Sequence, residues 1–135
     1  MRLAVGSILL AFLAIPADAK CIDVSPDNRL SLAGRLTFSV FPGPPNYESV
    51  DNGDMPEPTY ILVLKRNICI EDGGQFADPT QMFNSVQVYT THDSLWPKFK
   101  KLKGKQVTVS GSGFAAHTGH HHAPLVLEVT SIAAQ

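Results

Sequence analysis

The sequence lacks a marked excess of charge of either sign. It has 135 residues, with 11 lysines and arginines against 12 aspartates and glutamates, and a formal net charge of −1 at pH 7. A domain that binds nucleic acid through its phosphates is usually clearly basic. We therefore expect no nucleic-acid partner.

The chain also lacks the short motifs that mark common catalytic sites. Gly111-Ser112-Gly113 does not have the G-x-S-x-G spacing of a serine nucleophile on a sharp turn. No glycine-rich loop that cradles phosphate is present, and no internal repeat is seen. These absences favour a protein that is not an enzyme, but they leave the question open.

A long apolar run occurs only near the N-terminus, over residues 3–15, where it follows the positive charge of Arg2. This run is too short to span a bilayer easily. Residues 17–19, Ala-Asp-Ala, have the small-x-small pattern of a cleavage site. The order of these features predicts a secretory signal peptide over residues 1–19. The mature chain, residues 20–135, is then secreted or periplasmic and has no membrane span after cleavage.

Cysteine is scarce, with only Cys21 and Cys69 in the chain. Export implies an oxidising compartment, so we expect these residues to form a disulfide. On the chain-entropy model, closing a loop of nearly fifty residues stabilises the fold by about 4 kcal/mol. The alternative is a pair of buried thiols.

Alternation of apolar and polar residues predicts the strands. From Leu30 to Val40 the apolar residues share even numbering, and Gly34 falls on the same register. This pattern predicts a strand with one buried face and a bulge or sharp bend at the glycine. The other predicted strands cover residues 60–65, 86–90, 106–113 and 125–130, and the first of them continues through 68–70 after a bend. A short helix is predicted over residues 93–101. Asp93 caps its N-terminus, and Pro97 lies in its first turn.

Five strands with a helix between the third and the fourth predict an all-β fold with one short helix. A five-stranded, OB-like Greek-key barrel over residues 20–135, as a single domain, fits this order best, and a β-sandwich is the alternative. OB-folds bind ligands on the face of strands 2 and 3 and at the loops that join strands 1–2 and 4–5. In this chain those loops are residues 41–59 and 114–124, which we expect to line a common groove.

The two loops carry most of the chemically distinctive residues. The segment 41–59 contains prolines that exclude a regular helix or central strand. The segment 114–124 holds four of the five histidines. We predict that Tyr47 or Glu48 lies near His120 to His122. The residues predicted to bind a partner are Tyr47, Glu48, Ser49, Asp54, Tyr89, His117, His120, His121 and His122.

The histidines suggest two kinds of chemistry. Imidazoles bind zinc and copper, and His117, His120 and His122 are the candidate ligands. A carboxylate of the other loop (Glu48, Asp51 or Asp54) would complete the site, which could also support hydrolysis. The alternative is a loop whose histidines hydrogen-bond the proline-rich loop without any metal.

Several segments resemble a family of small, exported, uncharacterised bacterial proteins. They are GPPNYESVDNGD, the core Ile68-Cys69-Ile70, and GKQVTVSG leading into TGHHHAPLVLEV. Ala123 follows the histidines at a position where the family pattern leads us to expect threonine. The resemblance implies export and one small β-rich domain, and it implies no activity. The region from Gly104 onward also resembles bacterial OB-fold modules in its general pattern.

Together these features predict an exported binding module, monomeric, whose partner is a protein or a small ligand bound in the groove between residues 41–59 and 114–124. No cofactor is required by this function. The alternative is a protein that binds zinc or copper through the histidine cluster.

Overall fold

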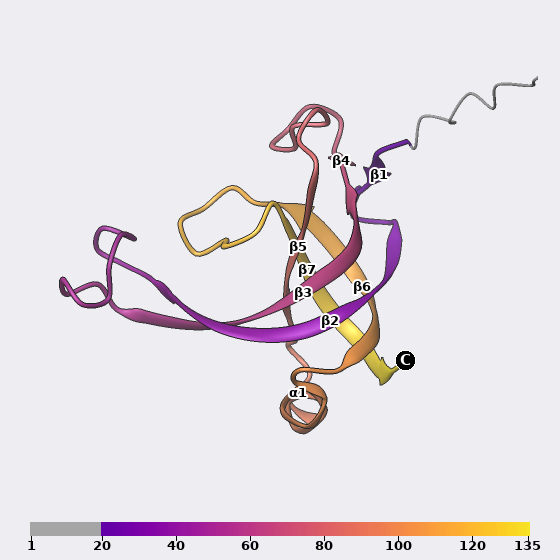
Figure 1. Cartoon of the computed structure of the whole chain (residues 1–135). Helices are drawn as coiled ribbons and strands as arrows, with labels where there is room; N and C mark the ends of the chain where they lie inside the picture. Colours follow the sequence, from indigo (N-terminus) through magenta and orange to yellow (C-terminus); the bar gives the residue numbers. More distant parts are fainter. Residues whose placement is uncertain (1–19) are drawn as a thin grey trace, which may run out of the picture.

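Strands dominate the computed structural model, which describes residues 20–135 (Figure 1). The predicted signal peptide lies outside the described residues. The elements are β1 (Ile22–Asp23), β2 (Arg29–Pro42), β3 (Pro56–Ile68), β4 (Ile70–Glu71), β5 (Phe83–Tyr89), the 3-10 turn η1 (Asp93–Leu95), α1 (Trp96–Leu102), β6 (Gln106–Ala115) and β7 (Leu125–Ala134).

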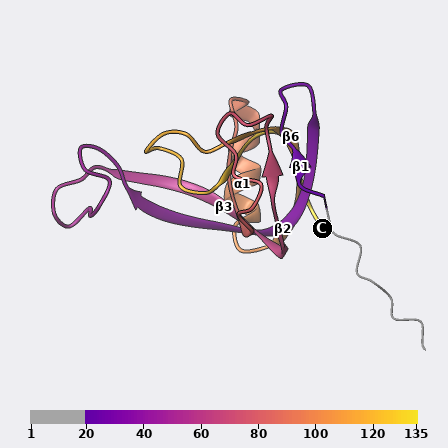
Figure 2. The ribbon, with the colours of Figure 1, turned by 90° about the horizontal axis from the view of Figure 1, so that it is seen from above.

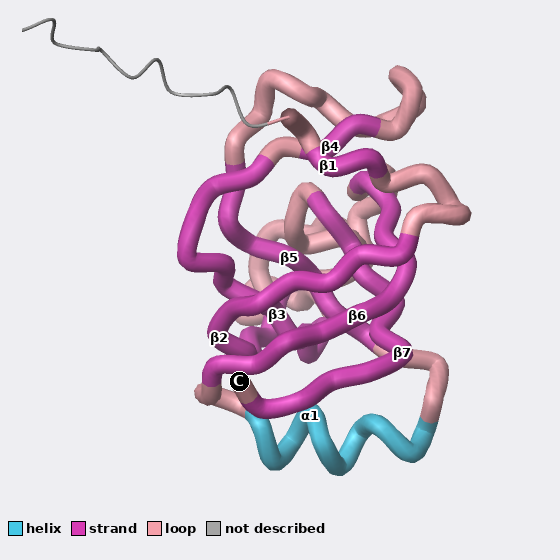
Figure 3. The backbone as a smooth tube through the Cα atoms, turned by 90° about the vertical axis from the view of Figure 1, so that its right-hand side faces the viewer, coloured by secondary structure: helices cyan, strands magenta, loops and turns pink. Residues whose placement is uncertain are grey.

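Five strands close into a ring of hydrogen bonds in the order β2-β3-β5-β7-β6. All neighbours are antiparallel except β5 and β7, which are parallel. Helix α1 lies between β5 and β6 in the chain and crosses one end of the ring (Figure 3). The predicted all-β class is confirmed, and the strand order is consistent with an OB-like fold, although the ring is not a regular barrel.

Gly34 allows β2 to serve two neighbours. The strand pairs with β6 from Arg29 to Arg35 and with β3 from Gly34 to Pro42. A Cβ atom at Gly34 would lie 2.4 Å from the carbonyl oxygen of Val63 in β3, so a larger residue does not fit this crossing. Strand β2 is therefore shared by two sides of the ring, and Gly34 is the residue at which it passes from β6 to β3.

The core fills the ring with aliphatic side chains, and Phe99 of α1 is fully buried among them. Each such side chain contributes about 1.5–3 kcal/mol when it leaves water. The largest fully buried side chains are Phe99, Leu36, Leu62, Ile70, Leu125, Leu127, Val86, Val88, Val107, Val109, Val126 and Val129.

Beyond the ring, β2 and β3 continue together as a two-stranded arm, best seen from above (Figure 2). We use "arm" for residues 38–42 and 56–60, and "tip loop" for residues 43–55. The buried face predicted to reach Val40 is wrong here, because Phe38 and Val40 are 41% and 53% exposed. Their side chains project from the arm, where no barrel core remains to cover them.

The prediction that residues 41–59 form a loop is wrong at both ends of the segment, although the prolines do stay out of a central strand. Strand β2 runs to Pro42, and β3 begins at Pro56 and includes Pro58. Strand β5 pairs with β3 only from Tyr60 onward, so the outer edge of β3 is free at both prolines. A proline is tolerated on such an edge because no neighbour needs its missing N–H.

The predicted helix forms, but with a different start. Residues Asp93–Leu95 form a 3-10 turn that leads into α1, and no side-chain cap is present at either N-terminus. The predicted capping role of Asp93 is therefore wrong. Pro97 does lie in the first turn of α1, where a missing N–H costs little.

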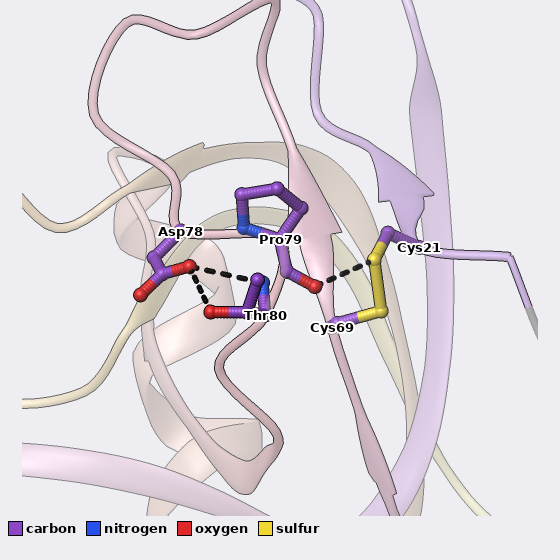
Figure 4. Close-up of a disulfide and its surroundings, with 5 residues drawn as sticks. All are labelled: Cys21, Cys69, Asp78, Pro79 and Thr80. Atoms are coloured by element: carbon purple, nitrogen blue, oxygen red, sulfur yellow. Dashed lines mark hydrogen bonds between the residues drawn. A yellow bond between two sulfur atoms is a disulfide. The ribbon is translucent and has the colours of Figure 1, made fainter.

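The disulfide between Cys21 and Cys69 is confirmed (Figure 4). It ties the start of the described chain to the end of β3, beside the short parallel pair of β1 and β4. The Sγ atom of Cys21 lies 3.2 Å from the carbonyl oxygen of Pro79. The bond is compatible with an extracellular location. Among residues 20–135, no helix has the length and apolarity to cross a membrane.

Candidate functional site

The arm and the histidine loop, which we define as residues 116–124, meet at Glu57. His122 Nε2 lies 2.6 Å from Oε2 of this carboxylate, and His120 Nδ1 bonds to Oε1. The side chain of His122 is only 9% exposed and that of Glu57 20%, whereas that of His120 is 60% exposed. One carboxylate from β3 therefore holds two imidazoles from a loop that is distant in sequence.

Opposing effects set the pKa of Glu57. Desolvation raises it, but the hydrogen bonds from His122 and His120, together with their charges, outweigh desolvation and lower the pKa below its ordinary value. The carboxylate is thus stabilised in its ionised form, which accepts hydrogen bonds from both rings.

Aromatic contacts extend this junction along both segments. The ring of Phe41, which pairs with Glu57 across the arm, stacks on the ring of His122 with 4.5 Å between centroids and 4° between planes. Tyr47 of the tip loop meets His120 edge-on at 5.5 Å, and its hydroxyl lies 3.3 Å from His120 Nε2. The predicted proximity of Tyr47 to these histidines is confirmed.

The backbone of the histidine loop also packs tightly against the tip loop. A Cβ atom at Gly119 would lie 2.8 Å from Cζ of Tyr47, so the absence of a side chain allows this approach. Gln87 of β5 also binds the histidine loop. Its Oε1 accepts the His122 N–H at 2.6 Å, and its Nε2 donates to the His120 carbonyl at 3.3 Å. The segments predicted to line a groove are therefore in direct contact.

Asp54 organises the tip loop from within. It is 4% exposed, and its carboxylate accepts backbone N–H groups of Asn46, Glu48 and Ser49 at 2.8–2.9 Å. The bonds from Ser49, Glu48 and Asn46 lower the pKa of Asp54, so the carboxylate stays ionised at neutral pH. Tyr47 has a left-handed backbone, with φ of 57°, inside this framework.

His121 has a structural role that its position in the sequence does not reveal. Its Nδ1 accepts the backbone N–H groups of His117 at 3.0 Å and Thr118 at 3.2 Å, so this nitrogen carries no proton. Burial, followed by the nearby His117, His120 and His122, lowers the pKa of His121. The neutral ring therefore closes the turn of the histidine loop.

His117 makes contacts that differ from those of His120 and His122. Its ring stacks on Phe76 at 4.6 Å, and its Nδ1 lies 2.9 Å from the carbonyl oxygen of Ala115. Within residues 20–135, no group of three or more histidine, cysteine, aspartate or glutamate side chains is arranged to hold a metal ion. The ligand set of His117, His120 and His122 remains a prediction.

The remaining predicted site residues are scattered. Glu48 is exposed, and Ser49 contributes its backbone N–H to Asp54. Tyr89 lines a separate pocket of about 550 Å³, with Tyr60 and Trp96 among its other residues. Burial, and next the charge of Glu128, raises the pKa of Tyr89. A binding role for these residues remains a prediction.

Sequence reasoning missed Glu57, Phe41 and Gln87. Glu57 is a lone carboxylate between two prolines, and this was the only signal that set it apart. Phe41 and Glu57 become neighbours only through the register of β2 and β3. That register could not be predicted because residues 41–59 were expected to form a loop.

Comparison with known proteins adds a family without a known role. Residues 85–133 match the model of a family described as "Domain of unknown function (DUF4431)". The match supports an uncharacterised family and runs from β5 into β7, so it includes the histidine loop but not the arm. No curated protein matches the chain.

Proposed function

We propose that the chain is a binding module that recognises a partner with the tip loop and the adjoining histidine loop. One observation carries this proposal: apolar side chains project into solvent from a loop whose backbone is fixed by a buried carboxylate. Tyr47, Val50 and Met55 are 37%, 38% and 63% exposed, while Asp54 holds the backbone around them.

Such an arrangement favours binding because ordering a flexible loop on association costs free energy. Each immobilised side chain costs about 0.5–1.5 kcal/mol, and a loop that is fixed beforehand avoids part of this cost. The contact between the Tyr47 hydroxyl and His120 supports the same conclusion, since it links the tip loop to the histidine loop.

The histidine contacts fix the orientation of the rings within the fold. His121 Nδ1 accepts two backbone N–H groups, and His117 Nδ1 lies against a backbone carbonyl. His122 is held between Glu57 and Phe41. Rings fixed in this way present a preformed surface to a partner, which supports the binding proposal.

Site-specific photocrosslinking in the exporting cells tests the proposal. A photoreactive residue is placed at Val50 in the tip loop and, as a control, at Met82, which is 55% exposed and lies outside both loops. We expect one discrete cross-linked partner from position 50 and none from position 82. Asp54→Asn should abolish the product by loosening the loop. Identical products from both positions, or none from position 50, would contradict the proposal.

The metal-binding alternative draws on a different observation, the convergence of His120 and His122 on Glu57. Two imidazoles and a carboxylate are donors that zinc accepts, but here they hydrogen-bond one another and are not arranged around an ion, so a metal would have to replace these hydrogen bonds. Equilibrium dialysis against zinc and copper tests it, with Glu57→Gln as the variant. Stoichiometric metal that is lost in the variant would support this alternative, and no bound metal in the unaltered chain would remove it.

A further inference from the structure

The two edges of the arm differ in their backbone polar groups. In an antiparallel pair, successive residues alternately direct their N–H and C=O groups toward the partner strand and away from it. Leu36 shows which residues of β2 direct their backbone groups away from β3. Its N–H donates to the Lys105 carbonyl at 2.9 Å, and its C=O accepts the Gly104 N–H at 2.6 Å. Both bonds point away from β3. Phe38 and Val40 follow at steps of two and therefore present their polar groups on the same outer edge.

The outer edge of β3 is closed to pairing. Pro56 and Pro58 lie opposite Pro42 and Val40, so their nitrogens point away from β2. Neither nitrogen carries a hydrogen, and proline on an edge strand is a common protection against pairing with another chain. The arm thus has one edge without N–H donors at these positions.

The outer edge of β2 is open at Phe38 and Val40, and it ends at Pro42, which follows at the same step and has no N–H to donate. Among the described residues, β6 pairs with β2 only as far as Arg35, and the last backbone bonds along this edge are those of Leu36. Phe38 and Val40 are 41% and 53% exposed and lie on one face of the strand. An exposed apolar strand with free N–H and C=O groups is a template for a further strand.

We propose that this edge pairs with the same edge of a second copy of the chain, in antiparallel orientation, so that the chain forms a dimer and not the monomer expected from the sequence. The distribution of charge along the edge favours a second copy of the chain as the partner. No lysine or arginine occurs between Leu36 and Leu64, and the tip loop exposes Glu48 and Asp51. The other end of the edge adjoins the turn that contains Lys103 and Lys105.

Antiparallel pairing brings the acidic tip loop of each copy toward the basic turn of the other. Lys103 is already directed at the arm, with Nζ 5.6 Å from the centroid of the Phe38 ring. Parallel pairing would instead place like charges together. Because each copy has one open edge, two copies close into a symmetric pair that does not grow into a filament. This inference uses the strand edge and does not rest on the function proposed for the tip loop.

Sedimentation equilibrium of the mature chain, with Val40→Pro and Val40→Ala as variants, tests the proposal. Val40 faces Pro58 across the arm and directs its N–H outward, so proline removes a donor from the edge without removing a bond to β3. We expect the unaltered chain and Val40→Ala to sediment at twice the mass of one chain, with Val40→Pro sedimenting as a monomer. A monomeric unaltered chain, or a Val40→Pro variant that remains dimeric, would overturn the proposal.

Amide hydrogen exchange supplies a test that needs no variant and so is unaffected if Val40→Pro fails to fold. The amides of Phe38 and Val40 should exchange more slowly as protein concentration rises, because the second copy accepts their hydrogens. The amide of Gln75, which donates within its own loop to Asp72, should not respond. Exchange at Phe38 and Val40 that is independent of concentration would overturn the proposal.

Discussion

Glu57 and His122 lie 65 positions apart in the sequence and are joined by a hydrogen bond of 2.6 Å between Oε2 and Nε2. This contact connects the arm, which extends beyond the ring of strands, to the histidine loop. The imidazole is 9% exposed and is also stacked on Phe41, so the bond lies in a partly desolvated setting. Hydrogen bonds to ionised groups are stronger there than on an open surface.

Removing the charge of Glu57 should loosen the histidine loop. We expect Glu57→Gln to lower the free energy of unfolding by about 1–3 kcal/mol, because two hydrogen bonds to a carboxylate are weakened. Urea denaturation measures this change. Glu48→Gln is the matched control: it makes the same chemical change at an exposed carboxylate of the tip loop and should leave stability within about 0.5 kcal/mol. Equal losses of unfolding free energy in both variants would contradict the role of Glu57 in holding the histidine loop.

A side chain at Gly119 should separate the tip loop from the histidine loop. The added Cβ of Gly119→Ala would lie 2.8 Å from the Tyr47 ring. Overpacking of a closed core costs about 1–3 kcal/mol, and we expect a smaller loss here because the Tyr47 ring is 37% exposed and can shift. Thermal unfolding measures the loss, and the double variant with Tyr47→Ala supplies the control because it removes the obstructing ring. The cost of Gly119→Ala should therefore shrink in that background, and an unchanged cost would show that the two segments do not touch.

Acid should destabilise the fold through His121. Its pKa is lowered in the folded chain from an ordinary value of 6.5, so the unfolded chain takes up a proton first as pH falls. The contribution of His121 to stability is full above about pH 6.5 and decreases as pH falls from there toward the lowered pKa.

The comparison of the unaltered chain with His121→Asn isolates this effect. The asparagine side-chain oxygen can accept backbone N–H groups and does not titrate. Urea denaturation of both proteins across the range below pH 6.5 should give a shallower pH dependence for the variant. Parallel curves would mean that His121 titrates equally in the folded and unfolded chains.

Loss of the disulfide should weaken the whole fold. Cys21 and Cys69 are 48 positions apart, and on the chain-entropy model opening this loop costs about 4 kcal/mol. The double variant Cys21→Ala and Cys69→Ala should show this loss in urea denaturation. Addition of a reductant to the unaltered chain should reproduce it and should have no effect on the double variant. A variant as stable as the unaltered chain would contradict the structural role of the bond.

The order of strands was readable because burial imposes a period of two on the sequence. Leu36, Leu62 and Val88 carry that signal, and Gly34 marks where β2 changes neighbours. The pairing of Cys21 with Cys69 followed from having only two cysteines. These features depend on local pattern or on counting, which a sequence displays directly.

The arm could not be predicted from the sequence because its apolar residues alternate without being buried. Phe38 and Val40 continue the alternation but project into solvent, and Pro56 and Pro58 lie in a strand that tolerates them only because its outer edge is free. The partnership of Glu57 with His120 and His122 depends on that arm. The sequence predicted that Tyr47 or Glu48 would lie near these histidines, and Tyr47 does. The carboxylate that bonds to them is Glu57, and not Glu48, Asp51 or Asp54 as the sequence suggested.

The central claim is that arm and histidine loop form one unit through Glu57 and His122. A double-mutant cycle of Glu57→Ala and His122→Ala, followed by urea denaturation, measures their coupling directly. The account predicts a coupling free energy of about 1 kcal/mol or more, as expected for residues in one hydrogen-bonded pair. Strictly additive effects of the two substitutions would contradict it.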